Sequence, residues 1–338
     1  MKKFLLIQTA FPGDVILATS LIEKLHQYFP ETKIDFLLRK GNESILANNP
    51  YLNEIIQWDK RQNKYSGLYR LISVIRKKKY DCVINLQRFG SSGILTLLSG
   101  AKSKIGFDKN PFSFFFTSKI THQIGNGKHE IERNHELIKE LTDSVPAKPK
   151  LYPSADDFAK VKTLLQQTIN NKPYVCIAPA SVWFTKQWPK EKWSELINNL
   201  PVDMVVFLIG SKDDVELCNS IRLQTIESKS ALVFNVAGKF SFLESAALMN
   251  SSTMNYVNDS APLHITSAMN APVTVIFCST IPAFGFGPLS NKSKISETTL
   301  KLECRPCGLH GFKACPLQHF NCAQSIQIND VLGITDHK

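Results

Sequence analysis

The sequence predicts an α/β protein made of two Rossmann-like domains, each a doubly wound parallel sheet, that face a central cleft. Strand-like apolar runs alternate with helix-like periodicity along both halves of the 338-residue chain, which is typical of parallel sheets. A stretch with three prolines, residues 143–154, separates the two series. The length also suits two domains of ordinary size. We therefore expect an N-terminal domain of residues 1–155 and a C-terminal domain of residues 156–338.

The N-terminal half opens with an apolar strand, residues 3–9. Its apolar run is too short for a signal peptide, because polar residues follow from Gln8 onward. Apolar residues at three- and four-residue spacing from Val15 to Phe29 predict a helix, which Pro30 ends. Similar patterns predict strands at residues 34–38, 54–58 and 80–86 and helices at residues 68–79 and 130–141.

The C-terminal half continues the alternation without a clear internal repeat. Its patterns predict strands at residues 173–179, 204–210, 232–236, 252–257 and 271–277, and helices at residues 190–199, 213–224, 243–249 and 262–269. Asp259 and Ser260 occupy the cap position of the last helix, and Pro262 suits its first turn. Free N–H groups and the helix dipole favour phosphate there, and His264 would add a donor. The alternative is a capped core helix with an ordinary histidine.

Positive charge is concentrated in the first half of the chain. Residues 1–150 hold 24 Lys and Arg against 14 Asp and Glu, whereas residues 151–338 hold 16 against 15. The densest run is residues 76–79. Nucleic acid, anionic lipid or a phosphorylated glycolipid would suit this field, and a solvated basic face is the alternative. No apolar run approaches the roughly 18 residues of a membrane span, so we expect a cytoplasmic protein.

Four of the eight cysteines cluster near the C-terminal end, and the other four lie in apolar strands or a helix. The clustered residues are Cys304, Cys307, Cys315 and Cys322. Four thiolates that open with C-x-x-C predict a structural zinc site, and a thiol-rich loop without metal is the alternative. Four sulfur ligands leave no open position for substrate, so the cluster is expected to be structural.

Polar side chains that follow strands carry the candidate chemistry. Asp14 begins the first helix, where it could take a proton from a hydroxyl or only complement the helix dipole. Lys186 is a mobile charge suited to diphosphate. Asp214 could bind ribose hydroxyls or cap the next helix. Arg133 could bind an acceptor phosphate or pair with Glu130. The sequence contains no Asp-x-Asp, P-loop or G-x-G-x-x-G pattern, which argues against a nucleotide hydrolase or dehydrogenase.

Several segments resemble, in the same order, motifs of glycosyltransferase family 9, the heptosyltransferases. The matching segments are Gly13-Asp14 after the opening strand, His129-Glu-Ile-Glu-Arg133 as H-x-x-E-R, Lys186-Gln-Trp-Pro189 as K-x-W-P, and Asp259-Ser260-Ala261 followed by His264 as D-[ST]-[GA]-x-x-H. Together they span most of the chain. Two positions depart from the family pattern: Gln8 replaces a frequent basic residue and Ser20 a frequent proline.

The resemblance implies a GT-B-like, inverting and metal-independent glycosyltransferase. It implies transfer of a heptose or related sugar from an ADP-linked donor to the lipopolysaccharide inner core, with no catalytic cofactor. The N-terminal domain would bind the acceptor and the C-terminal domain the nucleotide sugar. The implied roles are catalysis by Asp14 and Lys186, donor binding by Asp214, Asp259, Ser260, Ala261 and His264, and acceptor binding by Gly13 and Arg133.

Two other functions remain open from the sequence. A nucleotide-sugar epimerase shares the architecture but acts on the sugar nucleotide without an acceptor. A zinc-bearing nucleic-acid-binding protein would combine the basic charge with the cysteine cluster. Residues 301–322, however, carry only three basic side chains and one acidic one, so the basic field lies elsewhere. We therefore expect no nucleic-acid partner. The resemblance implies a phosphorylated lipopolysaccharide core acceptor and peripheral association with the cytoplasmic face of the inner membrane.

Overall fold

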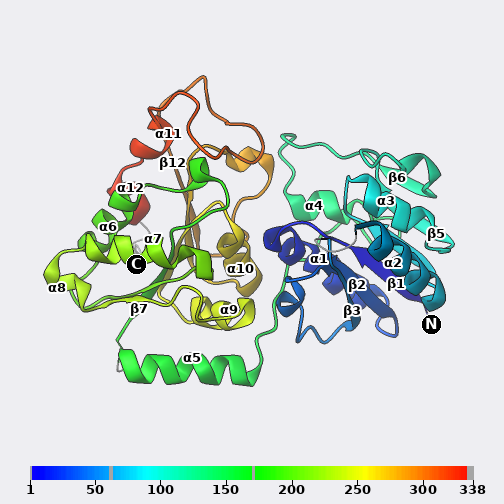
Figure 1. Cartoon of the computed structure of the whole chain (residues 1–338), viewed down its shortest axis with the longest axis horizontal. Helices are drawn as coiled ribbons and strands as arrows, with labels where there is room; N and C mark the ends of the chain where they lie inside the picture. Colours follow the sequence, from blue (N-terminus) through cyan, green and yellow to red (C-terminus); the bar gives the residue numbers. More distant parts are fainter. Residues whose placement is uncertain (1, 61–63, 170–171, 333–338) are drawn as a thin grey trace. The chain divides into compact units, whose positions relative to one another are not determined.

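The computed structural model describes residues 2–60, 64–169 and 172–332. The chain divides into two compact units, Met1–Tyr152 and Pro153–Lys338, and Figure 1 shows the elements of each. The division falls inside the proline-containing stretch of residues 143–154. Among the described residues, no helix is both long enough and apolar enough to cross a lipid bilayer.

Unit 1 contains a six-stranded parallel sheet in the order β3-β2-β1-β4-β5-β6. Its strands are β1 Lys3–Ile7, β2 Lys33–Arg39, β3 Leu52–Trp58, β4 Cys82–Asn85, β5 Ser103–Phe107 and β6 Ser118–Ile120. Its helices are α1 Pro12–Tyr28, α2 Lys64–Lys78, α3 Gly90–Leu97 and α4 Glu130–His135, with short 3₁₀ turns η1 Glu43–Ile45 and η2 Ser113–Phe115. This is the Rossmann strand order, which reverses direction between β1 and β4.

Both faces of this sheet are covered by helices. Leu5 and Ile7 of β1 pack with Leu71 and Ile75 of α2 on one face. Right-handed crossovers place α1 on the opposite face, where it packs against α4. A strand enclosed on both faces is apolar on both, which explains why β1 is a continuous apolar run rather than an alternating one.

Unit 2 repeats the same topology with β7 in the place of β1. Its sheet order is β12-β11-β10-β7-β8-β9, and every neighbouring pair is parallel. The strands are β7 Tyr174–Ala178, β8 Val205–Leu208, β9 Val233–Asn235, β10 Met254–Asn258, β11 Val273–Phe277 and β12 Ser293–Glu297. The helices are α5 Ala155–Thr168, α6 Lys190–Asn199, α7 Val215–Leu223, α8 Glu227–Ser230, α9 Phe242–Asn250, α10 Ala261–Met269, α11 Asn321–Gln324 and α12 Ile328–Leu332, with 3₁₀ turns η3 Phe184–Lys186, η4 Lys212–Asp214 and η5 Pro282–Phe284.

The large core of unit 2 lies between the sheet and helices α6, α7 and α12. Trp188 and Trp193 are fully buried in it and meet edge to face, with ring centroids 5.1 Å apart. Helix α9 packs on α10 and on β7, and α5 packs on α9. Trp188 directly follows the Lys186 turn, so this core fixes one end of the loop that carries the candidate lysine.

The fold class predicted from the sequence, two Rossmann-like doubly wound parallel sheets of the GT-B-like kind, is confirmed. Some elements differ from the expectation. Helix α5 begins directly at the end of the expected linker, and Ser154 caps it by accepting the Asp157 N–H at 3.1 Å. The helix expected over residues 130–141 ends at His135 and continues as hydrogen-bonded turns.

Candidate functional site

The candidate residues lie at the points where the strand order of each sheet reverses. In unit 1 this point is between β1 and β4, and in unit 2 it is between β7 and β10. Open α/β sheets bind ligands at the carboxyl ends of these strands, because the neighbouring connections leave in opposite directions. Asp14 follows β1, Lys186 follows β7, and Asp259 directly follows β10. Each unit therefore carries its own group of candidate residues at this edge of its sheet.

An ion pair between Lys186 and Asp259 forms the centre of the candidate group in unit 2. The Lys186 Nζ lies 2.7 Å from Asp259 Oδ2, and the two side chains are 15% and 8% exposed. The Thr280 hydroxyl donates to the same carboxylate oxygen at 2.7 Å. An ammonium carries three N–H donors, and Asp259 is its only ion-pair partner among the described residues. The lysine can therefore hold an anion while it stays fixed by the aspartate.

Helix α10 begins beside this ion pair, and its first turn is not capped by the expected side chain. Ser260 occupies the cap position but makes no capping hydrogen bond, and its hydroxyl donates instead to the Asn258 carbonyl at 3.4 Å. Pro262 contributes no N–H to the first turn. His264 is buried in α10, and its ring centroid lies 6.3 Å from that of Phe286. The helix N-terminus thus keeps its positive dipole end next to Lys186 and Asp259.

Asn258 fixes the Lys186 loop from the neighbouring strand. Its Nδ2 donates to the Pro179 carbonyl at 2.7 Å, and its Oδ1 accepts the Trp188 N–H at 3.0 Å. Both partners belong to the connection that leaves β7. This single buried amide therefore ties the start and the end of that connection to β10.

Asp214 caps its own turn in the structure. Its Oδ2 accepts the backbone N–H and the hydroxyl of Ser211, both at 2.7 Å. Gly210 allows this close approach, since an added Cβ would lie 2.8 Å from the Asp214 Cβ. The expectation that Asp214 caps the next helix is wrong, because it makes no side-chain capping bond to α7 and its carboxylate closes the preceding η4 turn instead. Ribose binding by the same carboxylate stays a prediction.

Asp14 lies in the first turn of α1, next to Gly13, and belongs to the candidate group in unit 1. Its Oδ2 accepts the Phe11 N–H at 3.2 Å, and the side chain is half-buried. Burial raises the pKa of the nearby Glu130; Arg133 opposes this shift, and the Asp14 charge adds to it. Asp14 thus lies within electrostatic range of the buried Glu130, and its role as a proton acceptor stays a prediction.

The guanidinium of Arg133 pairs with Glu130, as one interpretation of the sequence expected. Its Nε and Nη2 lie 2.8 and 2.7 Å from Glu130 Oε2, and Nη1 donates to the Lys128 carbonyl. The side chain is only 3% exposed. Burial, with the charges of Arg88 and Arg133, lowers the pKa of the neighbouring His122 to about 4. This region is thus electropositive, and His122 is neutral near pH 7.

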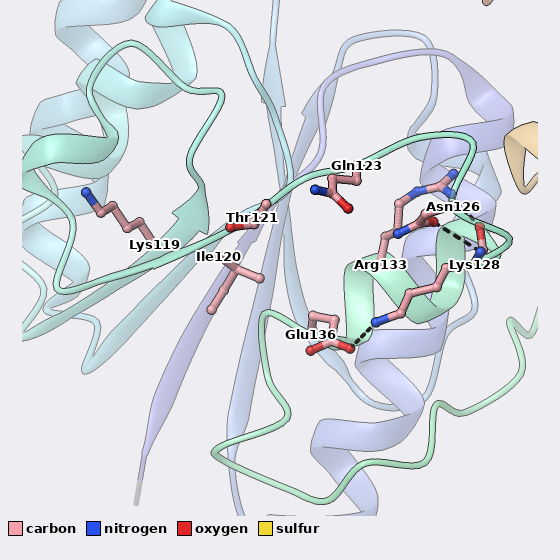
Figure 2. A pocket seen from close by; sticks show the side chains of 8 residues that line it. All are labelled: Lys119, Ile120, Thr121, Gln123, Asn126, Lys128, Arg133 and Glu136. Atoms are coloured by element: carbon pink, nitrogen blue, oxygen red, sulfur yellow. Dashed lines mark hydrogen bonds and ion pairs between the residues drawn. The ribbon is translucent and has the colours of Figure 1, made fainter.

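A pocket of about 350 Å³ opens beside Arg133 (Figure 2). Its lining combines three basic side chains with one acid, and comprises Lys119, Ile120, Thr121, Gln123, Asn126, Lys128, Arg133 and Glu136. Lys128 pairs with Glu136 at 2.8 Å, and this bond lowers the pKa of Glu136. The excess of positive charge suits an anionic group.

The cysteine cluster lies in unit 2, between β12 and α12. Burial raises the pKa of Cys322 to about 11, and burial together with Cys304 and Cys315 raises that of Cys307. Without a bound cation, these two thiols are therefore protonated near pH 7. Within residues 2–60, 64–169 and 172–332, no three His, Cys, Asp or Glu side chains form a group that could hold a metal ion. As they lie, the cysteines do not fit a four-sulfur site, and the structural zinc stays a prediction for elemental analysis.

Three supporting residues were missed in the sequence. Asn258 ends β10, Thr280 follows β11 by three residues, and Arg88 follows β4 by three residues. All three are polar and lie at or just beyond the carboxyl end of a strand; β4 and β10 flank the reversal points, and β11 is the neighbour of β10. A search for polar residues after every strand end would have found them.

Comparison with known proteins gives a consistent result. The family model described as glycosyltransferase family 9 (heptosyltransferase) matches residues 68–311. A lipopolysaccharide heptosyltransferase 3 from Escherichia coli is 30% identical over 292 residues, covering 83% of this chain and 84% of that protein.

Two solved structures share the fold. The glycosyl transferase family 9 structure from Veillonella parvula has a TM-score of 0.77 and 22% identity, covering 87% of this chain and 85% of that chain. The E. coli ADP-heptose lps heptosyltransferase II has a TM-score of 0.78 and 21% identity, covering 96% and 98%.

Proposed function

The chain belongs to glycosyltransferase family 9, and on that premise we propose that it transfers a heptose, or a closely related sugar, from an ADP-linked donor to the lipopolysaccharide inner core. The enzyme is a glycosyltransferase. The Lys186–Asp259 pair beside the N-terminus of α10 carries the proposal, because it supplies a fixed cation and a helix dipole at one point. That combination suits a diphosphate that leaves with negative charge.

The donor half of the reaction belongs to unit 2. Lys186 and the first amides of α10 bind the diphosphate, His264 adds a donor, and Asp259 and Thr280 hold the lysine in place. Asp214 binds the ribose hydroxyls. As the bond between the anomeric carbon and the diphosphate oxygen breaks, ADP leaves with the electron pair. The ammonium and the helix N-terminus stabilise that growing charge without a metal ion.

The acceptor half belongs to unit 1. The acceptor hydroxyl attacks the anomeric carbon from the side opposite the diphosphate, so the configuration at that carbon inverts. Asp14 takes the hydroxyl proton as the new C–O bond forms. Gly13 leaves room beside this carboxylate. The pocket at Lys119, Lys128 and Arg133 (Figure 2) suits a phosphate or carboxylate of the acceptor.

The excess of positive charge in unit 1 also fits a membrane-bound, phosphorylated acceptor. Residues 1–150 carry ten more basic than acidic side chains, from 24 Lys and Arg against 14 Asp and Glu. Anionic headgroups attract such a surface. We place the enzyme peripherally on the cytoplasmic face of the inner membrane, with the glycolipid as partner rather than nucleic acid.

The experiment is a transfer assay with mass detection of the product. The purified enzyme is incubated with ADP-heptose and a panel of truncated lipopolysaccharides, with and without EDTA. We expect one acceptor to gain a heptose mass at a rate that EDTA does not change. Incubation with the donor alone tests the epimerase alternative, because an epimerase alters the sugar nucleotide without an acceptor. Failure of every acceptor, together with change of the donor alone, would overturn the proposal.

A further inference from the structure

The cysteine-bearing segment, residues 304–323, lies against the loop that carries Lys186. Thr185, the neighbour of Lys186, is bound to Phe312 by two hydrogen bonds. The Thr185 N–H donates to the Phe312 carbonyl at 3.1 Å, and the Phe312 N–H donates to the Thr185 hydroxyl oxygen at 2.8 Å. Thr185 is 1% exposed. The backbone next to the candidate lysine is thus held by residues more than a hundred positions away in the sequence.

Gly311 and Ser279 complete this contact. Gly311 has φ +80°, and a Cβ added there would lie 2.8 Å from the Thr185 hydroxyl oxygen and 3.1 Å from Lys186 Cγ. The Ser279 hydroxyl donates to the Thr185 oxygen at 3.0 Å, and the Ser279 carbonyl accepts the Cys307 N–H at 2.9 Å. A glycine is therefore needed at 311 both for its backbone conformation and for the close approach to Lys186.

Arg305 anchors the segment to the end of β11. Its Nε donates to the Cys278 carbonyl at 2.8 Å, and its Nη2 donates to the carbonyls of Thr280 and Phe277 at 2.8 and 3.1 Å. Nη2 also lies 2.6 Å from Glu297 Oε2. Thr280 in turn donates to Asp259, the partner of Lys186. The same anchor therefore holds both the segment and the residue that orients the lysine's counter-ion.

The far end of the segment contacts both sides of the lysine turn. Phe320 stacks on Phe184 with ring centroids 5.3 Å apart, and the Ala323 carbonyl accepts the Trp188 Nε1–H at 3.2 Å. The lysine turn itself, Phe184–Lys186, is a single 3₁₀ turn. So short a turn has little stability of its own, and its position depends on these tertiary contacts.

We propose that residues 304–323 form a clasp that positions Lys186 for the donor diphosphate, with Thr185 and Gly311 as positioning residues. The proposal rests on the function proposed above. It gives the cysteine-bearing segment a role in donor binding that follows from its backbone contacts and does not require a metal.

The test compares two glycines of the clasp. Gly308 also has a positive φ, +64°, but an added Cβ would meet nothing closer than 3.9 Å. Gly308→Ala therefore imposes similar backbone strain without displacing Thr185 or Lys186. Affinities for ADP and AMP are measured by calorimetry, and donor and acceptor KM are measured separately. We expect Gly311→Ala to weaken ADP binding by about tenfold or more relative to Gly308→Ala, as for loss of a charge-assisted hydrogen bond. AMP binding and the acceptor KM should change much less.

Thr185 provides a second, milder pair of variants if Gly311→Ala does not fold. Thr185→Val removes the hydroxyl oxygen that Phe312 and Ser279 bind, whereas Thr185→Ser retains it. Thr185→Val should lower the ratio of ADP affinity to AMP affinity, whereas Thr185→Ser should keep the wild-type ratio. Folded variants that keep the wild-type ratio would overturn the clasp.

Lys186→Met separates failure of the clasp from failure of the proposed function. If it weakens ADP binding while the Gly311 and Thr185 variants do not, only the clasp is wrong. If Lys186→Met itself leaves ADP binding unchanged, the lysine does not bind the diphosphate, and both the clasp and the role given to Lys186 are wrong, whereas the transfer assay alone decides heptose transfer.

Discussion

Asp14 combines a structural hydrogen bond with the proposed role of proton acceptor. The amide oxygen of asparagine could accept the same Phe11 N–H, so Asp14→Asn should fold normally. Because an amide cannot take the proton, we expect turnover to fall by about a hundredfold or more, with ADP affinity unchanged. Steady-state kinetics and calorimetry measure both. Asp157→Asn is the matched control, since Asp157 accepts the Ser154 N–H in the same way at the start of α5. Near-normal turnover of Asp14→Asn would refute the base assignment.

The Lys186–Asp259 pair allows structural and functional effects to be separated. Lys186→Met leaves a buried carboxylate without its ammonium, which should cost roughly 3–5 kcal/mol of unfolding free energy. The double variant Lys186→Met, Asp259→Asn removes both charges and should recover much of that stability, because Thr280 can still donate to the amide oxygen. ADP affinity should remain low in both variants. Urea unfolding and calorimetry report the two quantities, and wild-type ADP affinity in the double variant would contradict the diphosphate assignment.

The lowered pKa of His122 makes the free energy of unfolding depend on pH. Its folded-state pKa, about 4, lies below its ordinary value of 6.5, because burial and nearby arginines disfavour the charged ring. On acidification the unfolded chain takes up the proton before the folded protein does. The contribution of His122 to the free energy of unfolding is therefore complete above about pH 6.5 and is lost as the pH falls toward 4. His122→Asn should therefore flatten the pH dependence of unfolding in that window. Glu130 has a raised pKa and acts in the opposite sense, but it is common to both proteins and cancels in the difference.

At the scale of elements, α9 and α10 differ in how their N-termini are satisfied. Ser241 caps α9 by accepting the Glu244 N–H at 3.2 Å, whereas Ser260 at the start of α10 makes no such bond. Ser241→Ala should lower the unfolding free energy by about 1 kcal/mol. Ser260→Ala should stay within about 0.5 kcal/mol in the absence of ligand. Thermal or urea unfolding of the two variants measures these changes. An equal loss of unfolding free energy in both would mean that Ser260 caps α10 as Ser241 caps α9.

Most strands and their polar ends could be predicted from the sequence, because both are local signals. Strands β5, β6 and β12 were not predicted, since they are only partly buried and lack a continuous apolar run. Apolar runs mark strands that are buried on both faces; Asp259 directly follows such a run, and Asp14 and Lys186 lie in the connections that leave two others. The cap at Ser260 was expected from residue type alone, but its hydroxyl bonds Asn258 instead. The clasp could not be predicted, since Arg305 and Phe312 act on residues 25 to 127 positions away. Such contacts depend on how the chain returns to the sheet, which local patterns do not encode.

At the scale of the whole molecule, the uneven charge has a measurable consequence. Residues 1–150 carry 24 Lys and Arg against 14 Asp and Glu, and residues 151–338 carry 16 against 15. The end of α2 is the densest basic run, and Arg76 and Lys77 are exposed there. If the enzyme works at an anionic membrane surface, unit 1 should supply most of the attraction. Each basic side chain near such a surface contributes about 1 kcal/mol, and salt weakens that contribution.

We therefore expect the protein to sediment with vesicles of mixed neutral and anionic phospholipid but not with neutral vesicles. Added salt should release it. Arg76→Gln with Lys77→Gln should weaken binding by about tenfold or more, from the loss of two charges near the surface. The matched control removes two charges from unit 2, at the exposed Lys162 and Lys172. The unit 2 variant and the α2 variant have the same net charge, so an effect of total charge alone would lower vesicle binding equally in the two variants. Equal losses would contradict a membrane-facing role for unit 1, and a loss confined to the α2 variant would support it.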